Sequence, residues 1–229
     1  MILNTPLQLV LAKSFIKGKA KNQINYIKYL NKYHKNLTSN IVKMEHFLKK
    51  SAKSITINEL MGYEGNISSF YWKSLRVILD APFEKRVTFG AKDIVNSSLN
   101  YGYAILYGKI QHSLVYAGLS LNISFLHSLD DKKPTLTFDM IEEFRTFIVD
   151  RTIVSMINKD EPIKLGNDGL LTKKSRQLIS KNIKEKLGSY TMWKKESVKI
   201  ENIIQTQSYN LKKVVEDNTL KYKPFIGKF

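Results

Sequence analysis

Apolar side chains recur every three or four residues over most of this chain, and no stretch alternates apolar with polar residues as a half-buried strand does. In residues 6–33, Ile16, Ala20, Ile24 and Ile27 fall on one face of a helix. The same spacing predicts further helices over residues 41–53, 58–79, 92–118, 137–158, 173–187 and 192–215. We therefore predict an all-α fold, one helical domain over residues 1–229 with about six to seven helices.

The length and composition of the chain support this prediction. A chain of 229 residues can bury a sizeable core, and a hydrophobic content of 43% is typical of globular proteins. No apolar run approaches the roughly 18 residues of a membrane span, so no membrane association is expected. The chain has no cysteine, which excludes disulfides and thiolate metal sites and fits a reducing, cytoplasmic location.

The charge balance favours a polyanionic partner. Lysine and arginine number 37 against 20 acidic residues, for a net charge of +17, so nucleic acid is the first expectation. Several of these charges lie on the predicted first helix, at Lys13, Lys17, Lys19, Lys21 and Lys28. They form either a solvated face or a track along a phosphate backbone.

One histidine and two acids stand close together in the sequence. His127 lies in a connection, and Asp139 and Glu142 follow on a predicted helix, three residues and so roughly 60° apart. The two carboxylates therefore share a face and, together with the imidazole, could hold a divalent metal. The competing interpretation is that both acids are favoured by the helix dipole and the histidine has no role.

A third carboxylate lies on an apolar helix face. Glu64 falls between Leu60 and Ile67 on the predicted helix over residues 58–79. A carboxylate in such surroundings needs a partner to remain ionised. The partner is either a buried lysine or arginine, or a metal shared with His127 and Glu142.

Four motifs in order resemble those of a known family. They are Tyr63-Glu64-Gly65 with Tyr71-Trp72, Leu99 to Leu106, Gly118-Leu119 with Phe125-Leu126-His127, and Leu136 to Arg145. The family is that of the CRISPR-associated spacer integrases, metal-dependent endonucleases that insert new spacers into CRISPR arrays during antiviral adaptation. The resemblance extends from about Leu11 to the ending Tyr222 to Phe225.

The resemblance implies a site and a reaction. The family's metal ligands match Glu64, His127 and Glu142, and Asp139 matches a supporting acidic position, so these four residues are the expected catalytic set. Two carboxylates and an imidazole suit Mg²⁺ or Mn²⁺. The expected reaction is transesterification, in which a DNA 3′-hydroxyl attacks a target strand, with hydrolysis when water attacks instead. The expected nucleic-acid contacts are Arg86, Lys132, Lys133 and Arg145.

The resemblance also implies partners. The expected substrates are double-stranded prespacer DNA and the CRISPR repeat, handled by a homodimer or a dimer of dimers, and possible assembly with a small companion adaptation protein is also implied. Family members usually begin with a β-rich domain, whereas this chain starts almost directly at the catalytic helices. Chain-to-chain contacts are therefore expected from helices, with the apolar residues Leu7, Leu9, Val10 and Leu11 as a candidate surface. The alternatives are a related transposase of a mobile element and a basic DNA-binding protein without catalysis.

Overall fold

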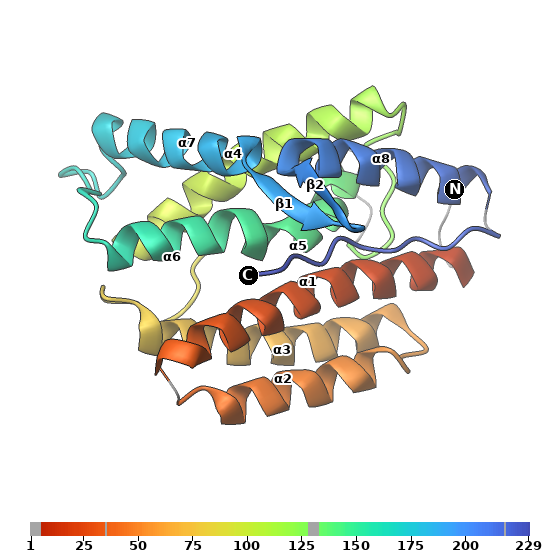
Figure 1. The fold of residues 1–229 in the computed structure, drawn as a ribbon, viewed down its shortest axis with the longest axis horizontal. Coiled ribbons are helices and arrows are strands. Elements are labelled where there is room, and N and C mark those ends of the chain that lie inside the picture. Colours follow the sequence, from red (N-terminus) through yellow and green to blue (C-terminus); the bar gives the residue numbers. More distant parts are fainter. Residues whose placement is uncertain (1–5, 35, 128–132, 218) are drawn as a thin grey trace.

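The computed structural model describes residues 6–34, 36–127, 133–217 and 219–229 (Figure 1). Within them the predicted all-α fold is confirmed. Its first helices are α1 (Pro6–His34), α2 (Thr38–Ser51), α3 (Ile57–Ile78) and α4 (Ile94–Tyr116). They are followed by α5 (Thr135–Arg145), the π-helical turn η1 (Thr146–Asp150), α6 (Arg151–Asn158), α7 (Lys173–Gly188) and α8 (Ile200–Glu216). Because α5, η1 and α6 run on as one helix, these residues form seven helical rods. None of the described helices combines the length and apolarity needed to cross a membrane.

The helices form two outer layers with one rod between them. Figure 1 shows α1, α2 and α3 on one side, α4, α7 and α8 on the other, and the α5–η1–α6 rod in the middle. The C-terminal segment runs back between α1 and the middle rod. Helix α1 contacts α2, α3 and α5, and small residues such as Ala12 and Ala20 allow this close packing.

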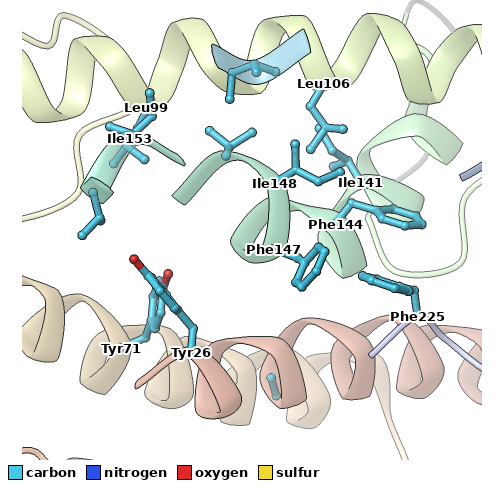
Figure 2. Close-up of a cluster of buried hydrophobic side chains, with 14 of the residues drawn as sticks. Tyr26, Tyr71, Leu99, Leu106, Ile141, Phe144, Phe147, Ile148, Ile153 and Phe225 are labelled. Atoms are coloured by element: carbon cyan, nitrogen blue, oxygen red, sulfur yellow. The ribbon is translucent and has the colours of Figure 1, made fainter. Parts of the chain in front are cut away.

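Aromatic and aliphatic side chains fill the space between the layers (Figure 2). Phe144 of the middle rod stacks on Phe225 of the C-terminal segment with 5.2 Å between ring centroids, and Phe147 meets the same ring edge-on. At Gly102 in α4, an added Cβ would lie 2.7 Å from Val149 Cγ1, so only glycine allows α4 to approach the middle rod there. These contacts fix the middle rod against both layers.

The π-turn interrupts the helix that the sequence predicts over residues 137–158. It widens the rod at Thr146–Asp150 and turns Asp150 toward two tyrosines. Tyr71 donates a hydrogen bond to Asp150 over 2.7 Å, and Tyr103 donates another over 2.5 Å. Such turns recur near functional sites, and this one begins about one turn beyond Glu142.

The predicted helix over residues 192–215 is wrong in its first part. Strands β1 (Tyr190–Trp193) and β2 (Glu196–Lys199) form an antiparallel hairpin instead, and the helix starts at Ile200. The hairpin turns at Lys194 and Lys195, which both have positive φ, 50° and 72°. Turns of this kind usually carry Asn-Gly or Asp-Gly, so a lysine pair gave no signal.

Candidate metal centre

The loop before α5 is held by one buried carboxylate. Asp139 is fully buried, and its Oδ2 accepts hydrogen bonds from the backbone N–H groups of Phe125 (2.6 Å) and Leu126 (3.1 Å). Its Oδ1 accepts from the backbone N–H of His127 over 3.2 Å, and the hydroxyl of Ser124 reaches the same carboxylate. Asp139 therefore holds the histidine loop in place, and its supporting role at a metal site stays a prediction.

The same carboxylate orients the imidazole. Nδ1 of His127 lies 2.6 Å from Oδ1 of Asp139, and the histidine side chain keeps 34% of its surface exposed. With Nδ1 engaged, Nε2 is the ring nitrogen that can bind a metal. A carboxylate behind a histidine in this way is the usual outer support of a histidine metal ligand.

The two glutamates predicted as ligands meet at a lysine. Nζ of Lys19 on α1 lies 2.6 Å from Oε1 of Glu64 on α3 and 2.8 Å from Oε2 of Glu142 on α5. Ser68 donates a hydrogen bond of 2.7 Å to the same Oε1 of Glu64. The buried lysine that was one of the two alternatives for Glu64 is therefore present, and it joins Glu64 to Glu142.

Positive charge dominates the ionisation of this cluster. Burial would raise the pKa of Glu142, but the nearby charges of Arg145 and Lys19 outweigh it and hold the pKa at about 2. Arg145 reaches Oε1 of Glu142 over 3.1 Å. Burial would lower the pKa of Lys19, but Glu142 and Glu64 outweigh it and raise that pKa above its ordinary value. The cluster is thus two carboxylates that share a cation.

The donor set suits a divalent metal. Two carboxylates already gathered around one positive charge, with an oriented imidazole nearby, are the donor types that Mg²⁺ and Mn²⁺ accept. In the described part of the chain, however, no three histidine, aspartate or glutamate side chains form a ready metal-binding group, because Lys19 stands between the two glutamates. Convergence of Glu64, His127 and Glu142 on one ion therefore stays a prediction.

The predicted nucleic-acid contacts differ in their surroundings. Arg86 is half-buried: it donates to Asn96 over 2.9 Å and to Asn100, and stacks over the ring of Tyr103 at 5.3 Å. The two asparagines of α4 thus hold an arginine that lies outside the helices, between α3 and α4. Arg145 pairs with Glu142 and also covers Tyr103, at 5.0 Å.

The two lysines of this predicted set remain untested as contacts. Lys133 is exposed just before α5, and Lys132 lies outside the described residues. Their role in binding nucleic acid stays a prediction.

A cavity opens beside the cluster. It measures about 540 Å³, and Lys19, Arg86 and Arg145 line it together with the rings of Trp72, Tyr103, Tyr107 and Phe138. Guanidinium groups bind phosphate, and aromatic rings stack on bases. Lys19 and the cavity are candidate functional features that sequence reasoning missed, because Lys19 was grouped with the other lysines of the first helix.

The sequence of this chain is similar to those of known proteins. The family model described as "CRISPR associated protein Cas1" matches residues 1–185. The chain belongs to the Cas1 family. This Cas1 chain is 32% identical to the "CRISPR-associated endonuclease Cas1 1" of Francisella tularensis subsp. novicida, over 96% of this chain and 69% of that protein. It is 28% identical to the "CRISPR-associated endonuclease Cas1 2" of Thermodesulfovibrio yellowstonii, over 98% and 71%. The family resemblance seen in the motifs is therefore confirmed.

Solved structures share the fold of this Cas1 chain. A Cas1 protein from Thermotoga maritima matches with a TM-score of 0.81 at 21% identity, over 92% of this chain and 66% of that one. A "Cas6-RT-Cas1--Cas2 complex" matches with a TM-score of 0.87 at 19% identity, over 99% of this chain and 26% of that one. A "Casposase bound to integration product" matches with a TM-score of 0.78 at 20% identity, over 94% and 66%. At these identities the likeness concerns the fold.

Proposed function

We propose that this Cas1 chain is a metal-dependent DNA endonuclease and integrase that inserts new spacers into a CRISPR array. The observation that carries the proposal is the pairing of Glu64 and Glu142 around one cation, beside a histidine that Asp139 orients. A structural salt bridge needs one carboxylate for one lysine, whereas two carboxylates and an imidazole suit a dication. Family membership and the names of the relatives support the same conclusion.

In this proposal each residue has a defined part. Glu64, Glu142 and Nε2 of His127 would hold Mg²⁺ or Mn²⁺, which supplies Lewis-acid stabilisation of charge on the phosphate oxygens. Asp139 keeps the imidazole in the tautomer whose Nε2 can bind. Lys19 and Arg145, both beside Glu142, would hold phosphate oxygens when the carboxylates bind the metal.

The reaction exchanges one phosphodiester bond for another. The 3′-hydroxyl of a prespacer strand attacks a phosphorus of the repeat, a new P–O bond forms, and the target strand leaves with its own 3′-hydroxyl. When water attacks instead, the result is strand cleavage. The cavity beside Lys19, with its arginines and aromatic rings, suits the nucleotide next to the reacting phosphate.

We also propose that the active form contains at least two chains. Inserting both ends of a spacer needs two sites, and the described cluster supplies one, so a homodimer or dimer of dimers is expected. The start of α1 is a poorer contact surface than the sequence predicted: Leu7 and Leu9 pack on the core, Leu11 is buried, and Val10 is 52% exposed. A Cas2-type companion is suggested by the complex whose Cas1 part shares this fold.

A transposase function is the second candidate. The casposase structure favours it, because a protein of this fold bound to an integration product is named there as a casposase. Both functions would use the same residues for the same bond exchange. Substrate choice separates them: an integrase uses short prespacer duplexes and a repeat, whereas a transposase requires the specific ends of its element.

The test compares the parent chain with His127→Ala. Removing the imidazole should lower strand transfer of a prespacer duplex into a repeat-bearing plasmid by on the order of a hundredfold or more. DNA affinity should change little, because it comes from many dispersed lysine and arginine contacts. His112→Ala is the matched control, since His112 is exposed on α4 and has no carboxylate partner among the described contacts.

The two variants and the substrates together decide between the functions. Equal strand transfer by His127→Ala and the control would exclude the proposed centre and favour a binding protein without catalysis. Transfer that needs element ends, and ignores prespacer duplexes, would favour the transposase. Loss of activity in EDTA and its return with Mn²⁺ are expected of the parent.

A further inference from the structure

The last residues of the chain form an extended strap inside the fold. After α8, residues 219–229 run between α1 and the middle rod (Figure 1). Tyr222, Phe225 and Gly227 face inward and are buried, whereas Lys221, Lys223 and Lys228 face outward. The strap therefore behaves as part of the core.

On the side of α5, the strap is held by one buried carboxylate. Oε1 of Glu143 accepts a hydrogen bond of 2.5 Å from the hydroxyl of Tyr222, and Oε2 accepts one from the backbone N–H of Phe225. Gln207 of α8 adds a bond of 2.9 Å to the carbonyl of Lys223. Both carboxylate oxygens of Glu143 are thus committed to the strap.

On the side of α1, the strap is held by one buried amide. Nδ2 of Asn22 donates to the carbonyl of Phe225 over 3.0 Å, and Oδ1 of Asn22 accepts from the N–H of Gly227 over 2.7 Å. The same Nδ2 donates to the backbone carbonyl of Glu143 over 2.7 Å. Asn22 therefore ties α1, α5 and the strap together at one point.

The strap packs tightly against α1 and the middle rod. A Cβ added at Gly18 would lie 2.8 Å from Cβ of Pro224 and 2.9 Å from Cβ of Glu143. A Cβ added at Gly227 would overlap the ring of Phe147, at 2.2 Å from Cδ2. The separation of α1 and α5 is thus set by direct contact with the strap.

The fixed points are chain neighbours of the candidate metal centre. Gly18 precedes Lys19, and Glu143 follows Glu142, so the strap contacts the rear of the α1–α5 junction whose front carries the Lys19–Glu142 pair. We propose that the strap, acting through Glu143 and Asn22, is a positioning element that sets the place of the Glu142 carboxylate in the centre. This inference rests on the proposed function, since it concerns the same carboxylate.

The test measures both metal affinity and stability in the 229-residue chain. Tyr222→Phe removes one hydrogen bond to Glu143 and keeps the ring against Phe15, and Glu143→Gln replaces an acceptor oxygen with an amide of nearly the same shape. Ile179→Val is the control: it trims a fully buried residue of α7, away from the strap. Urea unfolding identifies variants with a comparable loss of stability, and Mn²⁺ binding is titrated by electron paramagnetic resonance.

The strap variants should bind Mn²⁺ more weakly than the control at equal stability. We expect an increase in Kd of roughly threefold to tenfold for Tyr222→Phe and about tenfold or more for Glu143→Gln, on the scale of outer-shell changes at metal sites. The kcat for strand transfer should fall as the affinity for Mn²⁺ falls, and the KM for DNA should remain unchanged. In the double variant, the increase in Kd should be smaller than the product of the two single increases, because both substitutions affect the same hydrogen bond.

Two other outcomes would count against the inference in different ways. If the parent binds Mn²⁺ and the strap variants bind it as tightly as Ile179→Val does, the positioning role is overturned and the proposed function stands. If the parent itself binds no Mn²⁺ and transfers no strands, the proposed function fails and this inference fails with it.

Discussion

Replacing Lys19 by methionine tests whether the lysine and a metal compete for the same carboxylates. Methionine keeps the length of the side chain and removes the charge. The ammonium lies within 2.6–2.8 Å of both Glu64 and Glu142, and the three side chains are between 4% and 16% exposed. Its removal therefore leaves two nearly buried carboxylates facing each other, without the cation that joins them.

The expected loss of stability depends on the partners that the two carboxylates keep. Breaking a buried ion pair by removing one partner costs about 3–5 kcal/mol. Here Arg145 still pairs with Glu142 over 3.1 Å, and Ser68 still donates to Glu64 over 2.7 Å, so the lower end applies. We expect the free energy of unfolding in EDTA to fall by about 3 kcal/mol. Mn²⁺ should restore much of it, because a dication can replace the missing charge.

The metal should also bind more tightly to the variant. In the parent, the ion must displace the ammonium from two carboxylates, and in Lys19→Met it need not. A gain of about tenfold in affinity corresponds to about 1.4 kcal/mol, less than half of the predicted destabilisation. Urea unfolding with and without Mn²⁺, followed by circular dichroism, measures both quantities through the linkage of binding to stability.

Lys17→Met is the matched control, because Lys17 is exposed on the same helix. It should change stability by less than about 0.5 kcal/mol in either condition. A Lys19→Met chain as stable as the parent in EDTA would refute the charge argument. A chain that binds Mn²⁺ more weakly than the parent would refute competition and make Lys19 an aid to the metal instead.

Two further predictions concern single ionisable groups. Asp139→Asn keeps the shape but should cost about 2–3 kcal/mol and free the imidazole of His127, seen by urea unfolding and by the ring nitrogen shifts in NMR. Burial, with Arg151 nearby, lowers the pKa of Lys186 to about 8, so its charge opposes folding at pH 7. Lys186→Met should therefore stabilise the chain by about 1–2 kcal/mol after discounting partial exposure. This gain should shrink as the pH rises from about 8 to 10.5, because in that range Lys186 is protonated in the unfolded parent but neutral in the folded parent.

Periodicity was sufficient for the fold because the helices are long and bury continuous faces. The predicted ranges 6–33, 58–79 and 92–118 agree with α1, α3 and α4 to within about two residues, the usual uncertainty of helix ends. It failed where local backbone geometry departs from residue preference. The hairpin turns on two lysines with positive φ, and the π-turn inserts its extra residue among apolar side chains that fit an ordinary helix equally well.

The candidate site shows which part of a function is local in sequence. Asp139 and His127 are only twelve residues apart and are in direct contact, so the sequence pattern was enough to group them in one site. Lys19, by contrast, is distant in sequence from Glu64 and Glu142, which lie on two other helices. Its sequence did not distinguish it from the four other lysines of α1 with which it was grouped. A local signal did exist: Lys19 lies one turn from Phe15, Ile16 and Gln23, all buried. A lysine on such a face needs a carboxylate partner as surely as Glu64 needs a cation. Glu64 and Lys19 are thus two buried opposite charges, each of which meets the need of the other.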